Sequence, residues 1–269
     1  GVRYIYHENF KNHATPNVAL MYKPGKFNFR ASYAAGFRTP TLSELYATDI
    51  AKKNDRLTIG NLDLKPEKNN YFSLSAEYVH ERFSVSVNAF YNNIRDMIDY
   101  NTIATGDKAM EQYGHKEVRQ RDNIAEAKVH GINVSANAYL GAGFNLSGGY
   151  THLNTQDVEL EQPIDKSIKN AYNINAQWAH SWKIYRLNIN LNGRFNSKRF
   201  SKSYGYAPEY QLWDLNTRHS FNLKSVIIEP GCGMENLFDY MDDRPYNSNY
   251  ATLTPGRSFY ISLSLKFKS

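Results

Sequence analysis

Apolar and polar residues alternate along most of this chain. From residue 185 to residue 195 the odd positions are apolar or Gly, and the even positions are Arg or Asn. A period of two is typical of a β-strand with one apolar and one polar face. It recurs, in places with breaks, in segments 1–6, 15–22, 27–33, 72–78, 83–89, 132–140, 144–146, 172–178, 185–195, 213–223, 226–234 and 257–267. No stretch of similar length shows the 3.6-residue period of a helix, so the sequence predicts an all-β protein of about twelve strands.

The connections between these segments alternate between short and long. Tight turns are expected at 23–26, 81–82, 141–143, 181–183 and near 224, and long polar loops at 38–66, 97–122, 154–168, 197–208 and 238–255. Such a meander places all the long loops at one end of the sheet, which is the plan of a transmembrane antiparallel β-barrel. A soluble β-sandwich also alternates apolar and polar residues, and it stays the alternative fold.

Composition narrows the possible functions. Aromatic residues make up 14% of the 269 residues, which suits a barrel whose rings lie at two boundaries between water and lipid. The formal net charge is +6, but Lys and Arg are dispersed, so we do not expect a nucleic-acid partner. The single Cys232 excludes a disulfide within the chain.

Sequence motifs of enzymes are missing. The chain has no Gly-x-Ser-x-Gly elbow, no His-Glu-x-x-His pair and no phosphate-binding loop. Asp239, Asp242 and Asp243 gather in one stretch, but they lack the ligand spacing of a calcium loop, so a solvated turn is the favoured interpretation. We therefore predict no catalytic residue, no cofactor and no metal site.

Four short motifs carry a resemblance to a known family. They are "GFRTP" (36–40), "GNLDLKPEKNNY" (60–71), "ENLFD" (235–239) and "PGRSFY" (255–260). In this order the chain resembles TonB-dependent outer-membrane receptors, which are 22-stranded barrels with a plugged lumen. The resemblance implies that residues 1–269 are one incomplete domain, the last twelve strands of such a barrel. The plug and the N-terminal strands of the same receptor would then be partners outside this chain.

The resemblance also implies a function. A member of this family would sit in the cell outer membrane as a multi-pass β-barrel, contact its lipid, and take up a scarce small-molecule chelate with energy from the TonB complex. An iron complex, either a siderophore or haem, is the expected cargo. A cobalamin transporter of the same family and a passive porin-like or structural barrel are the alternatives. Haem-specific members carry a His between the first two motifs, and residues 41–59 have none.

The motif residues have expected structural roles. Gly36 would allow a bend or a close approach of its neighbour, and Pro40 would end the pairing of its strand. Pro66 would restart an extended strand. Arg38 would pair with a carboxylate such as Glu67 or present a cation to an anionic ligand, and pairing is the favoured role.

Ligand contacts are expected from the long loops. Phenols offer ring surface and a hydrogen bond, which makes Tyr46, Tyr100, Tyr246 and Tyr250 candidates, with anchoring at the membrane interface as the alternative for each. Tyr113 and His115, in "MEQYGHKEV", could hold haem iron, although a loop His is more often simply solvated. The other His candidates are His7, His13 and His152. Arg30, Arg186 and Arg194 are expected to face a basic lumen.

For the last predicted strand, the alternation predicts which side chains lie on each face. Phe259, Ile261, Leu263 and Leu265 are expected to face lipid, whereas Ser258, Tyr260, Ser262, Ser264 and Lys266 are expected to face the lumen. Phe259 and Phe267 resemble the aromatic assembly signal of outer-membrane barrels. Members of the family usually end on that terminal aromatic, and this chain continues with Lys268 and Ser269.

Overall fold

The computed structural model describes residues 1–269 except 9, 11, 124–125, 202–204, 243–253 and 269. Within the described residues, twelve strands form one antiparallel sheet. They are β1 (Val2–Ile5), β2 (His13–Tyr22), β3 (Phe27–Arg38), β6 (Glu67–Val79), β7 (Phe83–Arg95), β10 (Ala127–Gly141), β11 (Phe144–Asp157), β12 (Asn170–Trp182), β13 (Tyr185–Asn196), β16 (Tyr210–Asn222), β17 (Val226–Glu235) and β18 (Ser258–Phe267). The predicted all-β fold with about twelve strands is confirmed.

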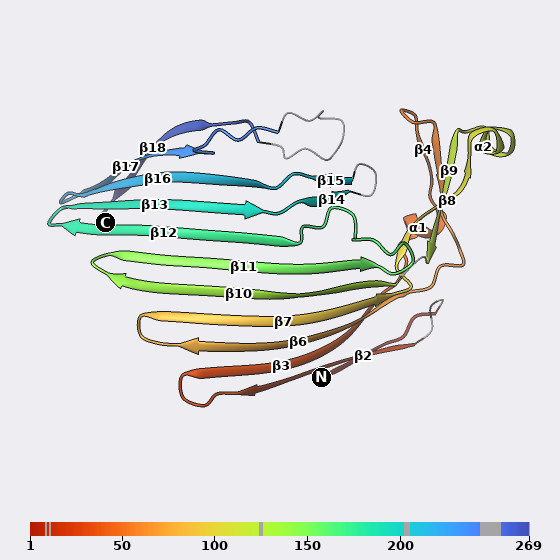
Figure 1. The fold of residues 1–269 in the computed structure, drawn as a ribbon, viewed down its shortest axis with the longest axis horizontal. Coiled ribbons are helices and arrows are strands. Elements are labelled where there is room, and N and C mark those ends of the chain that lie inside the picture. Colours follow the sequence, from red (N-terminus) through yellow and green to blue (C-terminus); the bar gives the residue numbers. More distant parts are fainter. Residues whose placement is uncertain (9, 11, 124–125, 202–204, 243–253, 269) are drawn as a thin grey trace.

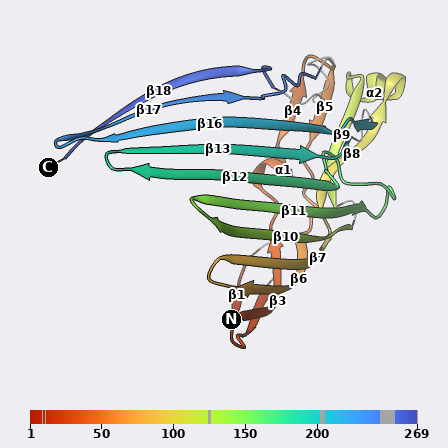
Figure 2. The ribbon, with the colours of Figure 1, turned by 60° about the vertical axis from the view of Figure 1, so that its left-hand side comes forward.

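The strands follow one another across the sheet in chain order. Each connection is therefore local, as in an up-and-down barrel. The first strand, β1, and the last, β18, stand at opposite ends of the order, and the sheet forms a curved wall (Figure 2). Apart from the short β1, the strands contain between 10 and 15 residues, which is enough to cross a bilayer at a tilt.

The two ends of the sheet differ as predicted. The tight turns lie together at one end, and the long connections lie together at the other (Figure 1). In the turn between β10 and β11, Gly141 and Gly143 have φ angles of 90° and 86°, which L side chains rarely adopt. A Cβ at Gly143 would also lie 1.9 Å from the carbonyl oxygen of Ala179, so this turn requires Gly.

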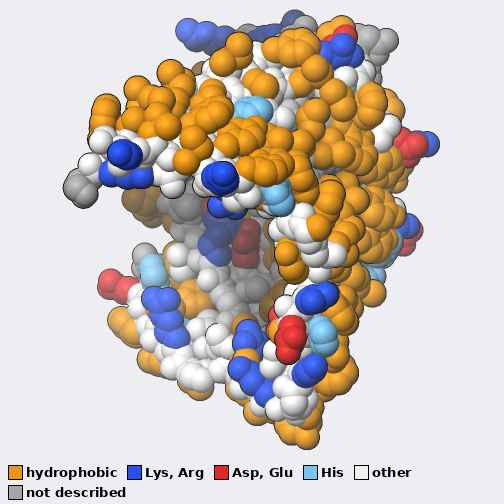
Figure 3. Space-filling view, turned by 90° about the vertical axis from the view of Figure 1, so that its left-hand side faces the viewer, with side chains coloured by type: hydrophobic (Ala, Val, Ile, Leu, Met, Phe, Trp, Pro, Cys, Tyr) orange, Lys and Arg blue, Asp and Glu red, His pale blue; other side chains and the backbone are white. Residues whose placement is uncertain are grey.

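The two faces of the sheet also differ. On the concave face, the Nδ2 of Asn175 donates to the Oδ1 atoms of Asn190 and Asn192, each at 2.6 Å. The other face is apolar, and Ile261 in β18 is 89% exposed on it. Viewed from the end of the tight turns, Figure 3 shows a hollow inside the curved sheet and apolar side chains over the outside of the wall. The outer face therefore has no protein cover among the described residues, and a bilayer would supply it.

The long connections contain more structure than the sequence predicted. Segment 38–66 holds α1 (Leu42–Tyr46), β4 (Thr48–Ala51) and β5 (Arg56–Ile59). The next long segment holds β8 (Ile98–Thr105), α2 (Gly106–Tyr113) and β9 (Glu117–Asn123), and 197–208 holds β14 (Arg199–Ser201) and β15 (Gly205–Ala207). The prediction of plain polar loops was wrong here.

The physical reason is the shortness of these elements. The helices have 5 and 8 residues, too few to show a 3.6-residue period. Their ends nevertheless carry local signals. A capping box of Thr41 and Glu44 begins α1, and Gly114, with φ of 73°, follows α2 in the left-handed conformation. No helix among the described residues has the length and apolar character needed to cross a membrane.

Candidate ligand-recognition site at the loop end of the sheet

An ion-pair cluster ties the loop segments to the sheet. Arg38, the last residue of β3, donates from Nη1 to Glu44 of α1 at 2.9 Å and from Nη2 to Glu67 of β6 at 2.6 Å. Gly36, two residues earlier, lies so close to Asn69 that a Cβ there would be 2.2 Å from its Oδ1. The predicted pairing of Arg38 with Glu67 is confirmed, and so is the close approach at Gly36. A ligand contact by Arg38 stays a prediction.

The cluster changes the electrostatics of Glu44. Partial burial raises the pKa of this carboxyl, but hydrogen bonds from Arg38 and Thr41 outweigh that effect and hold the pKa at about 2. Glu44 is therefore ionised at neutral pH. Its Oε2 also accepts the backbone N–H of Thr41 at 2.8 Å, which begins α1 at a defined point.

Three further hydrogen bonds join the loops at their bases. Glu67 Oε1 accepts the backbone N–H of Ile98, at the start of β8, at 2.8 Å. Asn123, at the end of β9, accepts the N–H of Lys65 through Oδ1 at 2.6 Å and donates to the carbonyl of Asp96 at 2.7 Å. Both long connections are therefore anchored to the same region of the sheet.

The two connections together form a small folded unit, which we call the loop sheet. It consists of β4, β5, β9 and β8, in that order, with α2 packed on it. Strand β5 comes from the first connection and β9 from the second, and they pair in parallel. A small core of Leu57, Ala109 and Val118 lies inside it. The loops are thus held in one arrangement by backbone pairing and by apolar burial.

Tyr113 and His115 are both engaged inside the loop sheet. Tyr113 packs against the small core. His115 Nδ1 lies 2.8 Å from Asp55 Oδ1, and this hydrogen bond lowers the pKa of Asp55. The pair links α2's end to the β4–β5 turn, sixty positions earlier in the chain. A haem-ligand role for either residue stays a prediction and would require these contacts to break.

One face of the loop sheet is basic and aromatic. The register places Arg56 opposite Glu117. It places Arg119 opposite Thr102 and Arg121, two positions further along β9, opposite Tyr100. Because alternate residues of a strand share a face, Arg56, Tyr100, Arg119 and Arg121 lie on the same side, and we call them the basic–aromatic face.

The geometry of this face favours an anion. The guanidinium of Arg121 lies 3.6 Å from the ring centroid of Tyr100. Arg119 pairs with Glu117, a carboxylate of the same face, at 2.6 Å. The Nε of Arg56 is buried and has no hydrogen-bond partner among the described residues. The register also places Asp49 on this face, opposite Thr58. Three guanidinium groups against two carboxylates leave an excess of positive charge beside an aromatic ring.

The sequence singled out Tyr100 but missed the three Arg residues. Arg119 and Arg121 alternate with Val118 and Gln120, which is the signal of a strand. Because 97–122 is predicted as a long polar loop, this short alternation does not enter the predicted sheet.

The remaining candidates lie elsewhere. Tyr46 ends α1, is 65% exposed, and lines a cavity of about 860 Å³ with His13 and Lys65. Tyr246 and Tyr250 lie outside the described residues. Phe259 and Phe267 lie in β18 and are exposed. Among the described residues, no three His, Cys, Asp or Glu side chains gather as metal ligands would. The ligand and assembly roles of these residues stay predictions.

Comparisons with known proteins give the context of this geometry. The model of the TonB-dependent receptor-like β-barrel family matches residues 1–237. A mutant of the ferric enterobactin receptor from Pseudomonas aeruginosa is similar, with a TM-score of 0.76 and 19% identity over 99% of this chain and 42% of that one.

Two structures from Acinetobacter baumannii are also similar. The siderophore receptor PirA has a TM-score of 0.75 and 17% identity, over 99% of this chain and 43% of that one. The ferric preacinetobactin receptor BauA has a TM-score of 0.68 and 19% identity, over 96% and 36%. At these identities the likeness shows the fold, and the chain spans less than half of each structure.

Proposed function

Because the chain belongs to the TonB-dependent receptor-like β-barrel family, we propose that it forms part of an outer-membrane receptor for an anionic iron–siderophore chelate. The family consists of transport receptors of the outer membrane rather than enzymes. Because the chain is a member of this family, uptake of a scarce chelate is the first hypothesis. The basic–aromatic face is the observation that supports an anionic chelate as the ligand.

The chemistry of the face supports an anionic chelate with aromatic groups. An Fe(III) complex of three catecholates carries net negative charge and exposes flat rings. Guanidinium groups pair with oxygen anions and also stack on aromatic rings, so Arg119, Arg121 and Tyr100 suit both parts of such a ligand. The loop sheet holds these side chains in a fixed arrangement, which reduces the entropy lost on binding.

We propose that residues 1–269 are one incomplete barrel domain. The strand edges of β1 and β18 stand at the ends of the sheet order, and a membrane barrel must satisfy its edge N–H and C=O groups. Further strands and the plug of the same receptor would complete the barrel, and TonB would act through the plug. The lumen would then include Arg30, Arg186 and Arg194, which alternate with apolar positions on their strands.

Binding by the purified receptor that carries this chain tests the ligand. The ferric complex of enterobactin serves as the anionic triscatecholate probe, and ferrichrome as the neutral hydroxamate probe, with protein fluorescence as the readout. We expect the R119Q/R121Q variant to bind the triscatecholate at least about tenfold more weakly, since charge-assisted contacts are the strong ones. The neutral probe should show no comparable change.

A matched control removes two cations from the other end of the sheet. Lys23 and Arg82 lie in tight turns and are exposed, so the K23Q/R82Q variant lowers the net charge equally. Equal loss of affinity in both variants would contradict the proposed site. A passive porin would pass small solutes without TonB, so chelate uptake that persists in a strain lacking TonB would contradict the receptor function itself.

A further inference from the structure

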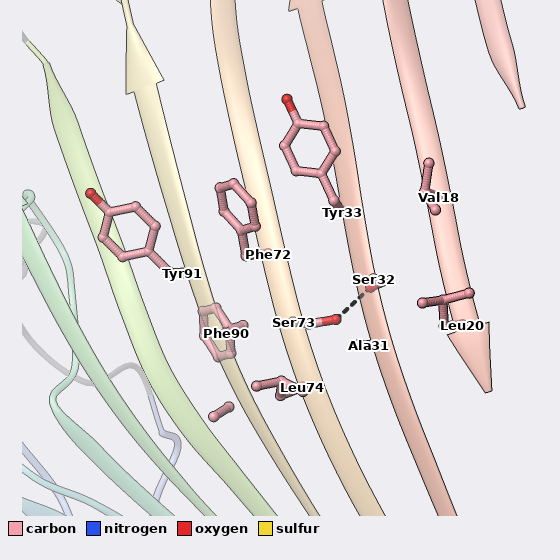
Figure 4. Close-up of a pocket in the computed structure, with 11 residues that line it drawn as sticks. Val18, Leu20, Ala31, Ser32, Tyr33, Phe72, Ser73, Leu74, Phe90 and Tyr91 are labelled. Carbon is pink, nitrogen blue, oxygen red and sulfur yellow. Dashed lines mark hydrogen bonds between the residues drawn. The ribbon is translucent and has the colours of Figure 1, made fainter. Parts of the chain in front are cut away.

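The apolar outer face of the sheet has a groove near the middle of its strands. It has a volume of about 540 Å³ and crosses strands β2, β3, β6 and β7. Ala31 and Ala89 stand opposite Leu74 from either side, and these two small side chains leave the depression. Tyr33, Phe72 and Tyr91 form one continuous row beside it (Figure 4). A second depression of about 370 Å³ continues along the same strands past Leu74 and Ala76.

Polar groups lie directly above this aromatic row, toward the loops. Figure 4 shows the hydroxyls of Tyr33 and Tyr91 pointing in the direction in which β3 and β7 run, which is toward the loop end. The hydroxyl of Tyr33 donates to Asn70 Oδ1 at 2.8 Å. Asn70 pairs with Asn93, and both share the outer face with Phe72 because their positions alternate with the inward residues.

A row of cations follows on the same face. Lys68 stands directly opposite Arg95, and Lys128 stands opposite Asn93. At about 3.3 Å per residue, Lys68 and Arg95 lie roughly 13 Å above Phe72 and Tyr91. The Arg95 side chain is 62% exposed.

The carboxylates near this row do not neutralise its positive charge. Glu126 lies 3.9 Å from Arg95 and 3.7 Å from Lys128, which are long ion pairs. Asp96 lines the cavity beside Lys68. Asp63 and Lys65 line the same cavity. Four cations against three carboxylates leave the region positive, and the Arg95 side chain stays largely exposed.

From this order of groups we propose that the groove and the cation row bind a phosphorylated lipid of the outer leaflet. The acyl chain would lie in the groove over Ala31 and Ala89, and the phosphate would lie against Lys68, Arg95 and Lys128. An amphiphile in a bilayer presents the same order of apolar, hydroxyl-rich and anionic layers. This inference rests on the proposed placement in the outer membrane but does not involve the chelate.

Charge complementarity favours a lipid over a second copy of the chain. In a symmetric dimer through this face, the same row of Lys68, Arg95 and Lys128 would approach its own copy, and like charges would repel. The groove is also within the usual size range of small-ligand sites, whereas a stable protein interface needs a much larger contact.

Native mass spectrometry of the detergent-purified receptor tests the site. The probes are hexa-acylated lipid A with two phosphates, the same lipid after removal of both phosphates, phosphatidylcholine and inorganic phosphate. We expect lipid A to bind at least about tenfold more tightly than the other three. The K68Q/R95Q/K128Q variant should lose about tenfold or more of this affinity, since each cation near a membrane surface contributes to lipid attraction. The A31L/A89L variant fills the groove and should weaken both forms of lipid A.

The control variant K23Q/K26Q/R82Q removes three exposed cations from the tight-turn end. Equal binding of dephosphorylated lipid A, or an equal loss of lipid A affinity in the control, would overturn the proposal. If the receptor forms dimers and the A31L/A89L variant is monomeric, the groove binds a second copy of the chain, and this result would also overturn the proposal. Binding of the ferric triscatecholate is measured in the same preparations. Receptor that binds the chelate but not lipid A refutes the lipid site alone.

Discussion

Replacing Arg38 by Gln should open the first loop at its anchor. The carboxylates of Glu44 and Glu67 expose only 13% and 17% of their side chains, and Arg38 exposes 43%. Removing one partner of a buried ion pair costs about 3–5 kcal/mol, and exposed pairs contribute about 0–1 kcal/mol. The half-exposed guanidinium lies between these cases, so we expect a cost of about 2 kcal/mol to the local structure.

Hydrogen exchange measures this local cost. The backbone N–H groups of Thr41 and Ile98 donate to Glu44 and Glu67, so they report directly on the cluster. A loss of about 2 kcal/mol corresponds to exchange that is about 30-fold faster at these amides. The amides of the central strands, for example in β12 and β13, should keep their protection.

Arg30 provides a matched control. It lies eight positions earlier in β3, on the same face as Arg38, and it is exposed with no ion pair among the described residues. The R30Q variant removes the same charge without touching Glu44 or Glu67. Exchange at Thr41 and Ile98 that changes less than about twofold in R38Q, or equally in R30Q, would refute the assigned role of the cluster.

Three further predictions follow from the geometry. The pKa of Glu44 is about 2 in the folded protein, below its ordinary value of 4.5. Its contribution is therefore complete above pH 4.5 and is lost as the pH falls toward 2. The protection of the Thr41 amide, measured relative to its intrinsic exchange rate at each pH, should fall across that range in the unmodified protein and much less in R38Q, and equal changes in both would contradict this assignment. A Cβ at Gly193 would lie 2.7 Å from the ring of Trp213. The G193V variant should therefore lose about 1–3 kcal/mol of stability, and the band of the folded barrel should disappear from gels after heating to a lower temperature. An unchanged temperature would contradict this packing. The H115A variant removes the contact between His115 and Asp55, so limited proteolysis should cut the loop sheet faster while β12 and β13 stay resistant, and unchanged cleavage would show that the contact does not hold the loops together.

The comparison of sequence and structure is clearest at the loop end. The strand faces and the turns were predictable because both depend on neighbours in the chain. Pro66 was expected to restart a strand, and β6 begins at the next residue, Glu67. The loop sheet was not predictable, because β5 meets β9 only after the chain has crossed the sheet and returned. The basic–aromatic face was not predictable for the same reason, because Arg56 and Arg119 come from different loops that are far apart in the sequence.

The sequence by itself determined the period-two strands, the apolar and polar faces and the end at which the long loops gather. It did so because side-chain alternation and connection length are local properties. The tertiary structure alone decided that Glu44 shares Arg38 with Glu67, that Asp55 holds His115, and which side chains meet across strands. Ala31 and Ala89 form a groove only because the register places both opposite Leu74. Register and loop pairing depend on contacts between distant residues, and a single sequence does not record those contacts.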